Sequence, residues 1–379
     1  MCGSSAWLRA AITARLARCL RRRILGGVID TDAKLAAYLA VVRAAAWIAV
    51  DTEADSLHAY PEKVCLIQIS TPEGDRLIDP LAAMDLAPLL AALNGHELIM
   101  HGADYDLRLL RKHHEFVPSA IFDTMLAARL LGERQFGLSA LVEKFVGVKL
   151  EKGSQKANWA RRPLTERMAT YARNDTRFLK SLSDKLRAEL VAKGRLGWHE
   201  ESCAQLVEEC TRQEMVDPDF VWRVKGCHGL SRAALAVLRE IWHWREREAL
   251  ASARPPFFVL SHDVMVELAD AAVNGRPVEP LVPRHLSDRR RSGLAEAVQT
   301  GLRVTPDRLP VIPRHRGHRP SEVERRRYAE IEKRRDHRAQ KLGIDPTLIA
   351  SRAVIGDLAQ GWDTHAAQLM SWQRELLQT

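Results

Sequence analysis

Clustered carboxylates are the first feature of this sequence that could do chemistry. Asp51 and Glu53 follow the apolar run 47–50. They are two residues apart, so both side chains point to one side where a predicted strand ends. Like charges at close range repel, and a buried carboxylate is costly unless something compensates it. A bound cation would compensate these acids, and solvation at the strand end is the simpler alternative.

Two later stretches also place carboxylates beside predicted elements. Asp104 and Asp106 follow the apolar run ELIM and precede the helix-like segment LRLLRK, and Tyr171 and Asp175 share one face of a predicted helix. Carboxylates from three such elements could together bind two Mg²⁺ or Mn²⁺ ions about 3.5–4 Å apart, because Mg²⁺ prefers carboxylate oxygens. Two ions at this spacing are what two-metal phosphoryl transfer needs. A tyrosine beside the last carboxylate can orient, and help to deprotonate, the attacking water.

The elements that must position these residues alternate between helix and strand from about residue 30 to residue 200. The first three predicted strands are close enough in sequence to pair antiparallel, which indicates a mixed α/β domain. Apolar runs predict strands at 47–51, 64–70, 75–80 and 96–102, and helices at 32–45, 86–93, 106–114 and 166–182.

Strand patterns end after about residue 201, and the rest of the chain reads as helical. Residues 231–253 have Leu235 and Leu238 at helical spacing, and two prolines at 255–256 end that helix. Residues 303–320 form a linker rich in Pro and Arg. A final helical segment covers 321–379, so an all-α part follows the α/β domain.

Composition limits the class of protein. The chain has 379 residues, of which 46% are hydrophobic and 28% charged, as in ordinary globular proteins. No apolar run approaches the roughly 18 residues of a membrane span. The six cysteines show no zinc spacing, which favours a reducing compartment. The net charge of +9 lies in the two ends of the chain, which weakly favours a polyanionic partner.

Residues 1–29 form a basic N-terminal extension with six arginines and no acid. This pattern is typical of an organellar transit peptide, and equally of a nucleic-acid-binding arm or an extension read from an upstream start codon. We expect no catalytic role for it and favour a cytoplasmic protein.

The ordered acids and their surroundings resemble the tyrosine-bearing subgroup of the DEDD exonuclease superfamily. The stretches VDTEADSLHAYPEKVCLIQIS, MHGADYDLRLL and NWARRPLTERMATYARNDTRFL are similar to ribonuclease D. The resemblance implies an RNase H-like exonuclease domain at 30–205, a mixed sheet flanked by helices. It also implies four metal ligands and a residue at the attacking water, which are Asp51, Glu53, Asp106, Asp175 and Tyr171. Asn158 stands where many relatives have Asp, and we expect no loss of metal from that change.

The segment 150–163 precedes the helix of Tyr171 and carries candidate RNA contacts. Its basic residues are positioned to meet phosphates near the site. Trp159 could stack on a base, although a packing anchor is the preferred interpretation. The candidate RNA-binding residues are Lys152, Lys156, Trp159, Arg161 and Arg162.

The helical part resembles the helicase-and-RNase-D C-terminal (HRDC) domain at 220–302, a helical bundle that often binds nucleic acid. Residues 321–379 resemble a second, divergent copy. The basic run 314–338 is consistent with RNA contact, or with a solvated helix surface because acids alternate with its arginines.

The resemblance implies a 3′–5′ exoribonuclease that uses two divalent cations, Mg²⁺ or Mn²⁺, and releases nucleoside 5′-monophosphates. The expected partner is RNA, as transfer-RNA precursors or other structured RNA, and the sequence leaves protein partners open. Two alternatives remain open at this point. One is the same chemistry on DNA, since no residue identifiably reads the 2′-hydroxyl. The other is a non-catalytic RNA-binding protein, against which the complete set of five site residues argues.

Overall fold

The structure of the protein is a computed structural model that describes residues 27–151, 153–212, 217–311 and 319–378. Most of the extension predicted at 1–29, the candidate RNA contact Lys152, and part of the linker predicted at 303–320 lie outside the described residues. The chain divides into two compact units. The first unit contains the described residues of 1–54, 64–212 and 319–379, and the second contains those of 55–63 and 213–318.

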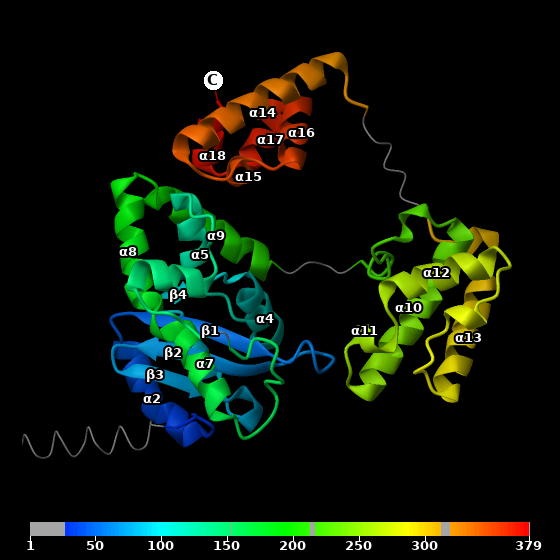
Figure 1. Ribbon diagram of the computed structural model, residues 1–379, viewed down its shortest axis with the longest axis horizontal. Coiled ribbons are helices and arrows are strands. Elements are labelled where there is room, and N and C mark those ends of the chain that lie inside the picture. Colours follow the sequence, from blue (N-terminus) through cyan, green and yellow to red (C-terminus); the bar gives the residue numbers. More distant parts are fainter. Residues whose placement is uncertain (1–26, 152, 213–216, 312–318, 379) are drawn as a thin grey trace, which may run out of the picture. The chain divides into compact units, whose positions relative to one another are not determined.

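A five-stranded mixed sheet forms the centre of the first unit (Figure 1). Its strands are β1 (Ile48–Ala54), β2 (Val64–Thr71), β3 (Gly74–Ile78), β4 (Glu97–Met100) and β5 (Ala120–Asp123). They lie in the order β3-β2-β1-β4-β5, so β1 is central. The predicted antiparallel pairing of the first three strands is confirmed, while β4 and β5 run parallel to β1.

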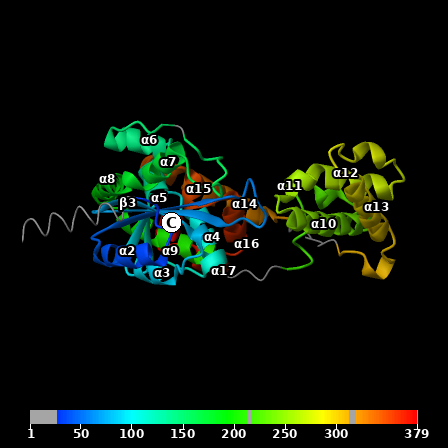
Figure 2. The same ribbon diagram turned by 90° about the horizontal axis from the view of Figure 1, so that it is seen from below.

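Helices cover both faces of this sheet. Figure 2 shows α7 on one side of it and α2 and α3 on the other. Ile48 and Val50 of β1 point into an apolar core with α2, α3 and α4, while α7 packs against β1, β2 and β3 from the opposite face. The helices are α2 (Asp32–Ala44), α3 (Ala87–Leu93), α4 (Asp104–His114), α5 (Thr124–Leu131), α6 (Leu138–Leu141), α7 (Glu166–Arg177), α8 (Leu179–Ala192) and α9 (Leu196–Thr211).

Side-chain caps fix where several of these helices begin. The Thr31 hydroxyl caps α2 and the Thr165 hydroxyl caps α7, each by accepting a backbone N–H of the first turn. Asp123 caps α5 by accepting the N–H groups of Met125 and Leu126. The position of Asp123 directly before a helix predicts this structural role, and the prediction is confirmed.

The C-terminal helices complete the first unit. They are α14 (Glu322–Leu342), α15 (Pro346–Ile349), α16 (Arg352–Gln360), α17 (Trp362–His365) and α18 (Ser371–Leu377). Leucines of α8 share one buried core with residues of α14, α16 and α18. Trp198 of α9 stacks on Trp372, with ring centroids 5.0 Å apart. The buried Arg195 guanidinium donates to the carbonyl oxygens of Leu130 and Leu342, at 2.6 and 2.7 Å. These helices therefore form part of the first unit's own core.

The second unit is a helical bundle. Its helices are α10 (Arg232–Ser252), α11 (Pro256–Val259), α12 (His262–Val273) and α13 (Asp288–Leu302). Helix α10 packs against the other three, and its apolar residues form the core together with the buried Trp222. Glu248 of α10 accepts hydrogen bonds from Arg289 and Arg290, which ties α10 to α13. The predicted all-α character is confirmed, because the described residues after 201 contain no strand.

Length and hydropathy also bear on membrane insertion. Among the described residues, no helix combines the length and the apolar character that crossing a bilayer would require.

Candidate active site

Strand β1 presents two acids to the face of the sheet that α7 covers. Side chains alternate along a strand, so Asp51 and Glu53 share the face of Ala49, opposite to Ile48 and Val50. Ala49 packs beside Leu179, the first residue of α8, which is separated from α7 only by the C-cap residue Phe178. The acids therefore point toward the helical layer that carries the remaining site residues.

Helix α7 brings Tyr171 and Asp175 to these acids. The two residues are four apart, so they lie on the same face of the helix. The helix is fixed against β2 by a hydrogen bond between the Ser70 and Thr176 hydroxyls, which are 2.7 Å apart and fully buried. Because Thr176 follows Asp175 directly, this contact sets where the Asp175 carboxylate lies relative to the sheet.

The structure brings three of the predicted acids into one cluster. One carboxylate oxygen each from Asp51, Glu53 and Asp175 lies within 4.8 Å of the others. The described residues contain no second group of three acidic, histidine or cysteine side chains with this geometry. All three side chains are half-buried. Three oxygens at such distances suit the hard ligand shell of Mg²⁺ or Mn²⁺.

Asp106, from helix α4, lies outside this group of three but close enough for its charge to act on Asp51 and Glu53. Its Oδ1 accepts two hydrogen bonds from Thr52, one from the backbone N–H at 3.0 Å and one from the hydroxyl. Thr52 lies between Asp51 and Glu53 and points to the α4 side, so it holds Asp106 beside them. Asp104 instead is exposed, pairs with Arg108 and accepts from the Cys210 thiol. The structure thus places Asp106, and not Asp104, next to the β1 acids.

Burial, and after it the negative charge of neighbouring acids, raises the pKa values of these carboxyl groups. Burial first, and then the negative charges of Asp106, Asp175 and Glu53, raise the pKa of Asp51 well above its usual range. Burial and the neighbouring acids raise the pKa of Glu53 to about 9. Burial raises the pKa of Asp175 to about 7, against a hydrogen bond from Tyr171, and that of Asp106 to about 6, against the bonds from Thr52.

These pKa shifts show that the carboxylates of the site need a compensating positive charge. Carboxyl groups with raised pKa values retain protons near neutral pH unless another positive charge replaces them. Oxygen donors that are close together and share excess negative charge are what divalent cations bind. The residues present therefore fit a divalent-cation site.

Tyr171 lies between the acids and the loop 147–165. Burial, followed by the charges of Asp175, Glu53 and Asp51, raises its pKa, while a hydrogen bond with Gln155 lowers it. A Cβ atom at Gly153 would lie 1.7 Å from Cδ2 of the Tyr171 ring, so the loop backbone approaches this ring closely. Tyr171 and Asp175 face a cavity of about 560 Å³ that the loop and the residues from Gly137 to Ala140 also line.

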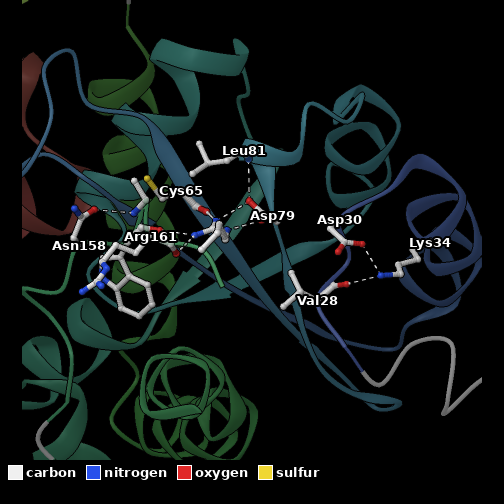
Figure 3. Close-up of polar contacts among 11 residues, drawn as sticks. Val28, Asp30, Lys34, Cys65, Asp79, Leu81, Asn158 and Arg161 are labelled. Atoms are coloured by element: carbon white, nitrogen blue, oxygen red, sulfur yellow. Dashed lines mark hydrogen bonds and ion pairs between the residues drawn. The ribbon is translucent and has the colours of Figure 1, made fainter. Parts of the chain in front are cut away.

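Arg162 anchors this loop to strand β2 and to Asp79, which directly follows strand β3. Its guanidinium pairs with both carboxylate oxygens of Asp79, each at 2.6 Å, and donates to the carbonyl oxygens of Cys65, Trp159 and Arg161. Figure 3 labels Asp79, Cys65 and Arg161, three of the residues that accept these hydrogen bonds. A guanidinium has five N–H donors, and here all five are used within the protein.

Two of the candidate RNA contacts are therefore corrected. Arg162 has no N–H left for a phosphate, and its charge is neutralised by Asp79. Trp159 is 1% exposed and packs against Tyr171 with ring centroids 6.0 Å apart, so it cannot stack on a base. The packing interpretation of Trp159 holds. Lys156 and Arg161 are exposed and stay predictions, and Lys152 lies outside the described residues.

Sequence reasoning missed residues that position the acids without binding a ligand themselves. Thr52 is one, although its place between two acids on a strand indicates a side chain on the opposite face. Asp123 has a second role, because its Oδ2 also accepts the N–H of Ala103, at 2.7 Å, where helix α4 begins. Asp123 thereby fixes the start of the helix that carries Asp106.

Comparisons with known proteins identify both folded parts. A family model described as a 3′–5′ exonuclease matches residues 27–191, and a model of the HRDC domain matches residues 234–272. The chain is 30% identical to ribonuclease D of Jannaschia sp. over 92% of each chain. It is 32% identical to ribonuclease D of Zymomonas mobilis, over 75% of this chain and 74% of the relative.

A solved structure agrees with these relatives. The chain is similar to the crystal structure of Escherichia coli RNase D, with a TM-score of 0.71 and 26% identity, over 92% of this chain and 97% of that one. The resemblance found in the sequence is confirmed across both the exonuclease and the HRDC parts. The chain belongs to the ribonuclease D family and is, by enzyme class, a hydrolytic 3′–5′ exoribonuclease.

Proposed function

We propose that this exoribonuclease uses two divalent cations, Mg²⁺ or Mn²⁺, held by Asp51, Glu53, Asp106 and Asp175. The observation that carries the proposal is the convergence of three carboxylate oxygens within 4.8 Å. When bound, such a cation pair activates the attacking water and stabilises charge on the leaving oxygen. The products are then nucleoside 5′-monophosphates released from the 3′ end.

Residues of the chain itself position the attacking water and the 3′-terminal nucleotide. The raised pKa of Tyr171 keeps its hydroxyl protonated near neutral pH. In this position Tyr171 orients the attacking water by hydrogen bonding. The cavity in front of Tyr171 and Asp175, of about 560 Å³, receives the 3′-terminal nucleotide.

We propose structured RNA, including transfer-RNA precursors, as the substrate. The relatives that carry the family assignment are ribonuclease D proteins, and the similar Escherichia coli enzyme is described as an exoribonuclease involved in structured RNA processing. The HRDC unit and the basic run 314–338 supply additional surface for phosphate contacts.

The decisive experiment digests a 3′-extended transfer-RNA precursor and a DNA strand of matched sequence, with Mg²⁺ or Mn²⁺, and resolves the products by length. We expect stepwise shortening of the RNA, no reaction in EDTA, and little shortening of the DNA. Preferential shortening of the DNA would show that DNA, and not RNA, is the preferred substrate.

Asp51→Asn is the matched control for that experiment. It removes one charge from the cluster while keeping the shape of the side chain, so we expect loss of cleavage with a retained melting transition. Near-normal cleavage by Asp51→Asn in Mg²⁺ would contradict the proposed cation site.

A further inference from the structure

Gln68 is a buried polar side chain next to the acid cluster. It lies in β2, all of whose residues are buried, and is itself 0% exposed. In the antiparallel pairing of β1 with β2, Gln68 is the direct partner of Asp51. Cross-strand partners project from the same face of a sheet with Cβ atoms about 4.5–5.5 Å apart, so a Gln side chain is long enough to bring its amide to the carboxylate of its partner.

The Gln68 amide has no structural task among the described residues. Neither its Oε1 nor its Nε2 has a hydrogen-bond partner there. Ser70, two residues along the same face, shows the usual arrangement, since its hydroxyl contacts both Asp75 and Thr176. A buried polar group without a partner lowers stability. An amide in this condition, beside a site of clustered acids, indicates a role in the occupied site.

We propose that Gln68 is a positioning residue of the exonuclease site, whose Nε2–H group holds the Asp51 carboxylate in its cation-binding orientation when a divalent cation is present. The inference rests on the proposed function. An ionised carboxylate offers more acceptor sites than one cation uses, and a donor on its remaining lone pairs fixes the plane of the group.

The chemistry of an amide suits this position. A Glu at 68 would add another negative charge to a cluster whose acids already repel one another, and a Lys would neutralise charge that the cations need. Gln donates a hydrogen bond without changing the net charge of the site.

The test compares wild type with Gln68→Met, which has similar length and no polar group that needs a partner. Thermal unfolding is measured in EDTA, and Mn²⁺ affinity is measured by titration calorimetry without substrate. We expect Gln68→Met to melt at or above the wild-type temperature in EDTA and to bind Mn²⁺ on the order of ten-fold more weakly. Ser70→Ala is the control, because it removes a hydroxyl that is hydrogen-bonded and should lower the melting temperature.

The outcomes separate this inference from the proposed function. Gln68→Met that melts earlier than wild type in EDTA, fails to fold, or binds Mn²⁺ as tightly as wild type overturns the positioning role. Wild-type protein that neither binds Mn²⁺ nor shortens RNA overturns the proposed function itself.

Discussion

The acid cluster makes the stability of the cation-free protein depend on pH, and the sign follows from the raised pKa values. A carboxyl group whose pKa is higher in the folded state contributes stability below its unfolded pKa, and that contribution is lost as the pH rises through the folded value. Glu53 is raised from 4.5 to about 9 and Asp175 from 3.8 to about 7. We therefore expect stability in EDTA to fall between about pH 7 and about pH 8.5.

The size of this loss of stability follows from the one proton that folded Glu53 retains. In this window folded Glu53 keeps a proton that the unfolded chain has released, and each such proton changes the free energy of unfolding by about 1.4 kcal/mol per pH unit. Over about 1.5 pH units the loss is about 2 kcal/mol, which corresponds to a fall in melting temperature on the order of 5 °C. Divalent cations replace the proton, so their stabilising effect should grow with pH.

The assay is differential scanning calorimetry in EDTA and in Mg²⁺ across this pH range, with Glu53→Gln as the matched control. The variant cannot ionise at position 53. Its melting temperature should therefore fall less steeply with pH, and the difference in slope should correspond to the release of about one proton. The buried thiols of Cys203 and Cys210, with pKa values raised to about 12, add a fall of the same sign, which the comparison subtracts. A wild-type melting temperature that rises with pH, or equal slopes for wild type and variant, would refute the reasoning.

Three further predictions concern the water, the loop and the C-terminal helices. Tyr171→Phe should slow single-turnover cleavage by roughly 10²-fold with RNA affinity nearly unchanged; weakened binding at a normal rate would mean a packing role. Gly153→Ala should lower the cleavage rate, because the added Cβ would overlap the Tyr171 ring. Gly137→Ala is the control and should leave the rate unchanged, because Gly137 lines the same cavity but an added Cβ there would have no atom within 4 Å. Additive losses in a Gly153→Ala, Tyr171→Ala double variant would show that the glycine acts elsewhere. Deletion of residues 319–379 should lower the melting temperature of the catalytic unit by at least about 5 °C, measured by calorimetry, and an unchanged value would contradict the shared core.

The sequence predicted the central elements well because their signals are local. The apolar runs of β1 and β2 are long, and their acids follow directly. Strand β5 was not predicted from its four residues, and its parallel pairing with β4 defines it. Choosing Asp106 over Asp104 required the family resemblance, since helix phase alone does not say which side faces β1.

Roles that depend on tertiary partners could not be predicted from spacing. Arg162 and Trp159 are residue types that often contact RNA. Only the fold shows that Arg162 pairs with Asp79 and that Trp159 packs against the Tyr171 ring. The helical pattern of 321–379 shows that an apolar face needs a partner without identifying that partner. The structure identifies it as the core that contains α5 and α8.

The division of the catalytic unit between 27–212 and 319–378 has a consequence for how the protein is made. Synthesis is vectorial, at about 5–20 residues per second, so the segment between these two parts emerges first and takes on the order of ten seconds. Throughout that interval Trp198 lacks its stacking partner Trp372, and the buried Arg195 guanidinium lacks the carbonyl oxygen of Leu342. A nascent chain stalled in the HRDC unit therefore carries all five site residues on an unfinished core. Such a chain is a natural target for chaperones and proteases before any RNA is bound.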